Sequence, residues 1–136
     1  MMKAASEWAG GYKSVLDDGR GHGVTVDLPI EDEGENEGPT ALELCVMSMA
    51  GCISTIFRTI AEKRRFVYKA FRVELEAEKG TVTLTSVKGR MEIVTEGSEK
   101  EAQTVLRLTM HTCPVGVIFN KAGIKLDYEL TVKKAT

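Results

Sequence analysis

The sequence has few of the residues that form covalent or metal-bound cross-links. Its three cysteines are Cys45, Cys52 and Cys113, and an odd number in a cytosolic chain argues against a framework of structural disulfides. No Cys-x-x-Cys pair occurs, and His22 and His111 are the only histidines. A zinc site assembled from these side chains would have no recognisable ligand spacing. We therefore expect no metal site.

The sequence also lacks an excess of basic charge and an export signal. Its net charge is −2, whereas phosphate binding needs a clustered basic surface, so we expect no nucleic-acid partner. The longest apolar stretch, residues 41–53, is too short to span a bilayer and contains Glu43 and Ser48. No apolar segment follows Lys3. We expect a cytoplasmic protein with no membrane partner.

Length and composition are typical of one soluble domain. The chain has 136 residues, of which 43% are apolar and 28% charged, and we expect a single domain over residues 1–136. Weak alternation and many glycines in the first thirty residues predict a small meander of strands, with a hairpin turn at residues 17–19. The acids and glycines of residues 31–38 predict a solvated loop without apolar anchors.

A long helix is predicted over residues 41–63. Thr40 and Glu43 have the spacing of a capping box, and Pro39 lies just outside it. The first half of this helix is apolar on nearly every side, so it needs cover on every side. A chain of this length has difficulty providing that cover alone, and an intertwined homodimer is a natural solution.

The rest of the chain predicts an α+β fold with segregated helices. Alternating segments from Phe71 and from Val82, joined by a turn at residues 79–80, predict an antiparallel hairpin with one wet face. A second capping box, at residues 98–101, begins a helix that breaks before Pro114. A short helix then runs to about Gly123, and alternation over residues 124–132 predicts a final strand.

The cysteines are the candidate chemical residues. Cys113 precedes Pro114 at an expected helix start, where backbone N–H groups and the helix dipole favour a thiolate; the alternative is a small apolar residue in a turn, and both stay open. Cys52 lies in an apolar helix, which by itself indicates a packed core cysteine. Cys45, seven residues earlier, is too distant along a rigid helix to pair with Cys52, and we interpret it as core.

Two charged residues are candidates for activating a thiol. Glu43 is positioned to act as a base or to orient an arginine near Cys52, although its capping-box role is the stronger interpretation. Arg20 is a loop cation with no assigned partner, and its alternative is an ordinary surface arginine. His22 and His111 do not lie in a recognisable nucleophile–base pattern.

Several segments in this order resemble the OsmC/Ohr family of osmotically inducible and organic hydroperoxide resistance proteins. Residues 38–44 and 49–52 are similar to its central helix, residues 113–115 to its second cysteine, residues 124–130 to its last strand, and residues 8–11 to its N-terminal glycine pair. The resemblance implies an α+β fold with antiparallel sheets around a long central helix. It also implies an intertwined homodimer with active sites at the subunit interface.

The resemblance further implies a thiol-dependent peroxidase without a bound cofactor. Cys52 would be oxidised by an organic hydroperoxide to a sulfenic acid, Cys113 would close a disulfide, and an external dithiol would reduce it. In the hydroperoxide-reductase branch an arginine and a glutamate occupy the places of Tyr12 and Leu42, so Arg20 and Glu43 are the candidate substitutes. The alternatives are a protein that binds a small hydrophobic ligand without catalysis and a redox sensor.

Overall fold

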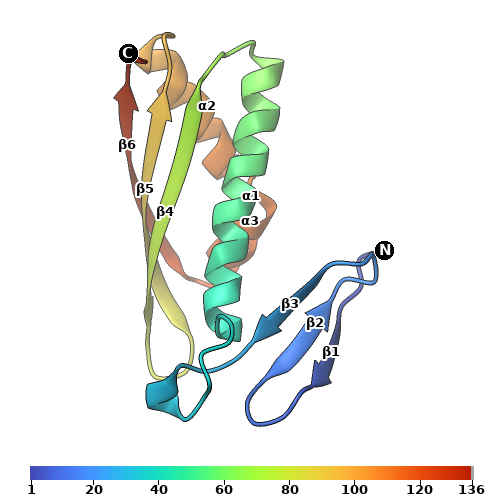
Figure 1. The fold of residues 1–136 in the computed structure, drawn as a ribbon. Coiled ribbons are helices and arrows are strands. Elements are labelled where there is room, and N and C mark those ends of the chain that lie inside the picture. Colours follow the sequence, from blue (N-terminus) through green and yellow to red (C-terminus); the bar gives the residue numbers. More distant parts are fainter. Residues whose placement is uncertain (136) are drawn as a thin grey trace. The chain divides into compact units, whose positions relative to one another are not determined.

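A computed structural model describes residues 1–135 (Figure 1). They divide into two compact units, residues 1–45 and residues 46–135. The first unit contains the strands β1 (Ala5–Trp8), β2 (Ser14–Asp17) and β3 (Gly23–Val26) and the short 3-10 helix η1 (Ile30–Asp32). The helix α1 (Ala41–Lys63) begins in this unit and continues into the second. That the chain is a single domain stays a prediction.

The first unit is built on the predicted meander. Its sheet has the order β1-β2-β3, and both pairings are antiparallel. Gly10 and Gly11 have φ of 97° and 56° in the turn before β2, a conformation that side chains disfavour. The β2–β3 hairpin turns at the predicted place, where the Asp18 carboxylate accepts the N–H groups of Arg20 and His22.

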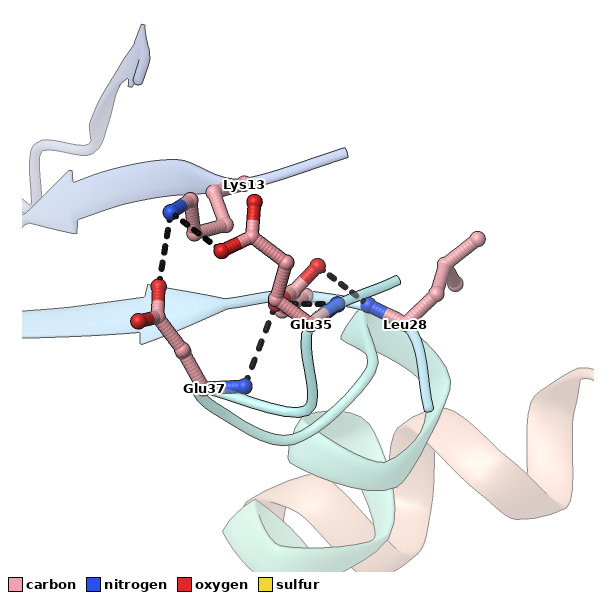
Figure 2. A network of polar contacts seen from close by, with 5 residues as sticks. Lys13, Leu28, Glu35 and Glu37 are labelled. Carbon is pink, nitrogen blue, oxygen red and sulfur yellow. Dashed lines mark hydrogen bonds and ion pairs between the residues drawn. The ribbon is translucent and has the colours of Figure 1, made fainter. Parts of the chain in front are cut away.

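The acidic segment after β3 is mostly exposed and has no apolar anchor, as predicted, but polar contacts organise it around Asp27. Asp27 is only 2% exposed, and its carboxylate accepts N–H groups from Leu28, Glu35 and Glu37 at 2.8, 3.2 and 3.1 Å. The ammonium of Lys13 bridges the carboxylates of Glu35 and Glu37 (Figure 2). The anchors are polar, which explains why the apolar pattern did not reveal them.

Helix α1 begins and ends as predicted. The Thr40 Oγ1 accepts the Glu43 N–H at 3.0 Å, and the Glu43 carboxylate accepts the Thr40 N–H at 2.9 Å, which completes the capping box. Its buried residues follow one stripe at intervals of four: Met49, Ile53, Phe57 and Ala61. Cys45 is exposed, so its assignment to the core is wrong for this chain, whose buried stripe on α1 starts only at Met49.

The second unit contains a three-stranded sheet in the order β4 (Ala70–Lys79), β5 (Leu84–Val94) and β6 (Lys125–Lys133). The predicted hairpin is present, since β4 and β5 pair antiparallel. The expectation that the sheets are antiparallel throughout is wrong in one pairing, because β6 lies parallel to β5. The reason is the connection: two helices carry the chain back across the sheet before β6 begins.

One face of this sheet is buried and the other is charged. Val87, Met91 and Ile93 of β5 are buried, whereas Lys88 and Arg90 between them are exposed. The helices therefore cover a single face, as Figure 1 shows for α1, α2 (Glu99–Thr112) and α3 (Pro114–Lys121). This arrangement confirms the predicted α+β class with segregated helices.

The second capping box is only half formed. Ser98 Oγ accepts the Glu101 N–H at 3.1 Å, as predicted. The Glu101 carboxylate instead accepts two hydrogen bonds from the Arg64 guanidinium, at 2.7 and 3.2 Å. This pair ties the end of α1 to the start of α2, and it holds the pKa of Glu101 below its usual value.

Among the described helices, α1 is the one whose length and mean hydropathy of 1.6 would allow it to cross a membrane. Core helices of soluble proteins often have the same properties, so composition alone does not decide. The buried stripe of α1 packs within the second unit, and Phe57 contacts the aromatic rings of Phe66, Tyr68 and Phe71. We therefore interpret α1 as a core helix.

Candidate thiol site

Cys52 lies on α1 at the edge of the buried stripe, next to Ile53. Its side chain is partly exposed, unlike the fully buried Met49 and Ile53 on the same helix. Beside it, Gly51 faces open space, since an added Cβ would meet no atom within 4 Å. Cys52 is therefore more accessible than the packed core cysteine that its helix predicts.

Cys113 occupies the break between α2 and α3. It is the C-terminal cap of α2, donating its N–H to the Thr109 carbonyl at 2.9 Å, and it is also the N-terminal cap of α3. Pro114 then starts α3, a position that needs no N–H donor. Cys113 Sγ accepts the Gly116 N–H at 3.4 Å, and the residue is 0% exposed. The expected helix start at this cysteine is confirmed.

The fold brings Cys52 and Cys113 together, and the two side chains are hydrogen-bonded. Burial, followed by this hydrogen bond, raises the pKa of Cys113 to about 11, although the N–H groups of Gly116 and Val115 act in the opposite direction. Of the two alternatives left open for Cys113, a thiol of lowered pKa is therefore not the one found in the dithiol. The helix start favours the thiolate as expected, but desolvation and the neighbouring sulfur outweigh it.

This arrangement suits two-electron thiol chemistry. Two cysteines whose side chains are hydrogen-bonded need little rearrangement to form a disulfide. They also differ: Cys52 is partly exposed, while Cys113 is buried and keeps its proton at neutral pH. Within residues 1–135, no group of three or more potential ligand side chains is placed to hold a metal ion.

The two candidate activating residues have local partners. The Glu43 carboxylate is hydrogen-bonded to the Thr40 N–H, so the capping interpretation is confirmed for it. The exposed Arg20 guanidinium lies 3.6 Å from the Asp18 carboxylate, which also contacts His22 Nδ1 at 2.7 Å. His111 is exposed at the end of α2. A role for Arg20 or Glu43 beside Cys52 stays a prediction.

Sequence reasoning missed Gly116 as part of this site. Its N–H is the hydrogen-bond donor to Cys113 Sγ, and an added Cβ would lie 3.6 Å from that sulfur. The signal was available, because a cap residue and its N–H donor three positions later have the spacing of the capping boxes recognised elsewhere in the chain. The pattern was overlooked because cysteine is not one of the residue types usually found at a helix N-cap.

Comparison with known proteins agrees with the fold and the order of these elements. The family model described as OsmC-like protein matches residues 34–129. No curated protein matches the sequence. The fold is similar to that of an OsmC-like protein from Mycoplasma pneumoniae, with a TM-score of 0.88 at 13% identity, covering 98% of this chain and 97% of that one.

Two further solved structures with this fold are named for hydroperoxide resistance. One is an organic hydroperoxide resistance protein OsmC from Legionella pneumophila, with a TM-score of 0.74 at 17% identity, covering 98% of this chain and 96% of that one. The other is OhrB of Bacillus subtilis, with a TM-score of 0.67 at 13% identity, covering 96% of this chain and 98% of that one. Because the family model matches more than half of the length of this chain, the chain belongs to the OsmC-like protein family.

Proposed function

We propose that this protein is a thiol-dependent peroxidase that reduces organic hydroperoxides. The observation that supports this most strongly is the contact between Cys52 and Cys113, because it places an accessible sulfur next to a second sulfur that can resolve it. The names of the Legionella and Bacillus relatives support an organic hydroperoxide as the oxidant. The reaction needs no bound cofactor, and it contributes to defence against oxidative stress.

The proposed cycle has three balanced steps. The Cys52 thiol gives up its proton, and the thiolate attacks the terminal peroxide oxygen and breaks the O–O bond. Cys52 becomes a sulfenic acid, and the departing alkoxide takes up one proton and leaves as the alcohol. Cys113 then attacks the Cys52 sulfur, forming a disulfide and releasing water. An external dithiol reduces that disulfide and restores both thiols, and its own sulfurs become oxidised.

We propose that the working unit is a homodimer. Met47 of α1 is 53% exposed, and Leu44 and Val46 are only partly covered, although this helix is apolar. Within Met1–Cys45, Asp27 is the one buried residue, so this unit has almost no core of its own. A second copy would cover the exposed apolar residues of α1 and the first unit. It would also allow Arg20 or Glu43 of either copy to contribute to the thiol site.

The location that fits this chemistry is the cytoplasm. A cysteine pair that must return to the dithiol after every turnover depends on a reducing compartment. The low-molecular-weight and protein dithiols that could serve as reductant are maintained in such a compartment.

The test is consumption of tert-butyl hydroperoxide with dithiothreitol as reductant. The wild-type protein should consume the peroxide catalytically, and Cys52→Ser should reduce the rate to that of dithiothreitol alone. Cys45→Ser is the matched control, since Cys45 lies on the same helix and is exposed, and it should retain the wild-type rate. Equal rates for Cys52→Ser and wild type would refute the proposal.

Binding of a small hydrophobic ligand is a second candidate function. A groove of about 810 Å³ between α2, α3 and β6 has a mixed lining, in which polar and charged side chains alternate with the apolar Met110, Val117, Ile124 and Leu126. Its size suits a small ligand. The test is to titrate the wild-type protein and the variant Val117→Asp with a fluorescent fatty acid. Tight binding by the wild type that is lost in the variant would favour a binding protein over a peroxidase.

A further inference from the structure

We propose that Cys113 has a second catalytic role that precedes resolution: its thiol is the general acid that protonates the departing oxygen when Cys52 cleaves the peroxide. The inference rests on the proposed peroxidase function. It is carried by three features: Cys113 is fully buried, it is hydrogen-bonded to the attacking sulfur, and its sulfur caps α3.

The cleavage step needs a proton donor close to Cys52. Attack on an alkyl hydroperoxide expels an alkoxide, which is a strong base and a poor leaving group unless it is protonated as it departs. A peroxide that approaches Cys52 Sγ from the side of Cys113 would lie next to the Cys113 thiol, because the two side chains are hydrogen-bonded. Cys113 is therefore a side chain that holds a proton beside the attacking sulfur.

The surroundings of Cys113 fit a group that gives up its proton during the reaction. Burial keeps the thiol protonated in the resting dithiol, so the proton is available when the peroxide arrives. Once the proton has left, the Gly116 N–H and the start of α3 face the new thiolate and stabilise it. The cap therefore stabilises Cys113 most strongly after the proton has been transferred.

The step is balanced. The Cys52 thiolate forms an S–O bond, the O–O bond breaks, and the Cys113 proton moves to the alkoxide, giving the Cys52 sulfenic acid, an alcohol and a Cys113 thiolate. That thiolate then attacks the Cys52 sulfur and expels hydroxide. The peroxide gains two electrons and the two sulfurs together lose two. Peroxide cleavage therefore creates the Cys113 thiolate in the same step as the Cys52 sulfenic acid that this thiolate attacks.

The test measures the first step alone, as peroxide loss in a single turnover with enzyme in excess. Two oxidants are compared: tert-butyl hydroperoxide, which releases an alkoxide, and peracetic acid, which releases a carboxylate that needs no proton. Cys113→Ala should slow the alkyl hydroperoxide about a hundredfold, which is the lower range for loss of a general acid. The same variant should react with peracetic acid within a few fold of wild type.

Cys113→Ser keeps a group that can donate a proton and should recover part of the lost rate. It should therefore show a smaller contrast of the same direction between the two oxidants, which can be measured if the alanine variant fails to fold. Unchanged rates with both oxidants would overturn the inference and leave Cys113 as a resolving residue only. An equal loss with both oxidants would also overturn it, because that pattern indicates a displaced Cys52. Failure of the proposed function is distinguishable, since Cys52→Ser would then match wild type.

Discussion

The rings of Phe57 and Phe71 are stacked with their centroids 3.9 Å apart and their planes inclined by 11°, which fixes α1 against strand β4. Phe57 also contacts Phe66 and Tyr68 edge to face. This cluster lies little more than one helical turn beyond Cys52 on α1. The position of the Cys52 thiol relative to Cys113 therefore depends on aromatic packing as well as on the backbone of α1.

Replacing Phe57 by alanine tests this packing. The side chain is 0% exposed, so Phe57→Ala should lower the free energy of unfolding by about 3–5 kcal/mol, and Phe57→Leu by clearly less. Urea denaturation followed by circular dichroism provides the measurement. A loss for Phe57→Ala no larger than that of an exposed substitution such as Thr59→Ala would contradict the packing described here.

Gly116→Ala tests whether the cap on Cys113 requires glycine. An added Cβ would lie 3.5 Å from Cys113 Cβ and 3.7 Å from Met49 Cε, which are ordinary contact distances. The N–H donor is retained, and alanine favours helix, so stability should stay unchanged or rise by up to about 1 kcal/mol. Peroxidase activity should also be retained. A marked fall in the melting temperature would show that the contact is tighter than described.

Asp27 should make the stability depend on acid pH. Burial alone would raise its pKa, but the N–H groups of Glu37, Leu28 and Glu35 outweigh this and lower it. Its stabilising effect is therefore complete above the unfolded value of about 4 and is lost as the pH falls through the lower folded value. Asp27→Asn should be less stable than wild type at pH 7, and the difference should shrink on acidification. A constant difference from pH 7 to pH 2 would be inconsistent with this.

Reversing a charge on the exposed face of the second sheet should lower the free energy of unfolding. On β5, Lys88 lies between Glu76 of β4 and Asp127 of β6 in the strand register. Lys88→Glu places three acids side by side and should cost about 0.2–1 kcal/mol for each cross-strand pair, whereas Lys88→Gln should cost less. The difference between the variants should narrow in high salt. Denaturation in low and high salt measures it, and a salt-independent difference would exclude an electrostatic cause.

The cysteines should differ in their reaction with iodoacetamide. Because burial and Cys52 raise the pKa of Cys113 to about 11, roughly a thousandth of Cys113 is ionised at pH 8. Peptide mapping should find Cys113 unlabelled in the folded protein when the partly exposed Cys52 is labelled. Labelling of Cys113 ahead of Cys52 would reverse the roles proposed for the two thiols.

Interactions between residues close in the sequence made the helix starts of this fold predictable. Thr40 with Glu43, Ser98 with Glu101 and Pro114 mark helix starts from neighbouring residues alone, and all three starts are confirmed. The features that sequence reasoning missed depend on distant partners. Glu101 bonds Arg64 across 37 positions instead of completing its own box.

The chemistry of the thiol site was less predictable for the same reason. The acidity of Cys113 is set by its burial and by Cys52, neither of which appears in the residues around it. The parallel pairing of β6 with β5 follows from how α2 and α3 carry the chain back, not from alternation within β6. Local patterns therefore identified the two cysteines as candidates, while their hydrogen bond and the raised pKa of Cys113 required the fold.

The most direct test of the central claim is to treat the reduced protein with one equivalent of tert-butyl hydroperoxide and to map its thiols by mass spectrometry without added reductant. The prediction is a disulfide joining the peptides that contain Cys52 and Cys113, with Cys45 unchanged. Two unlinked cysteines, with Cys52 intact or slowly oxidised to sulfinic acid, would contradict it.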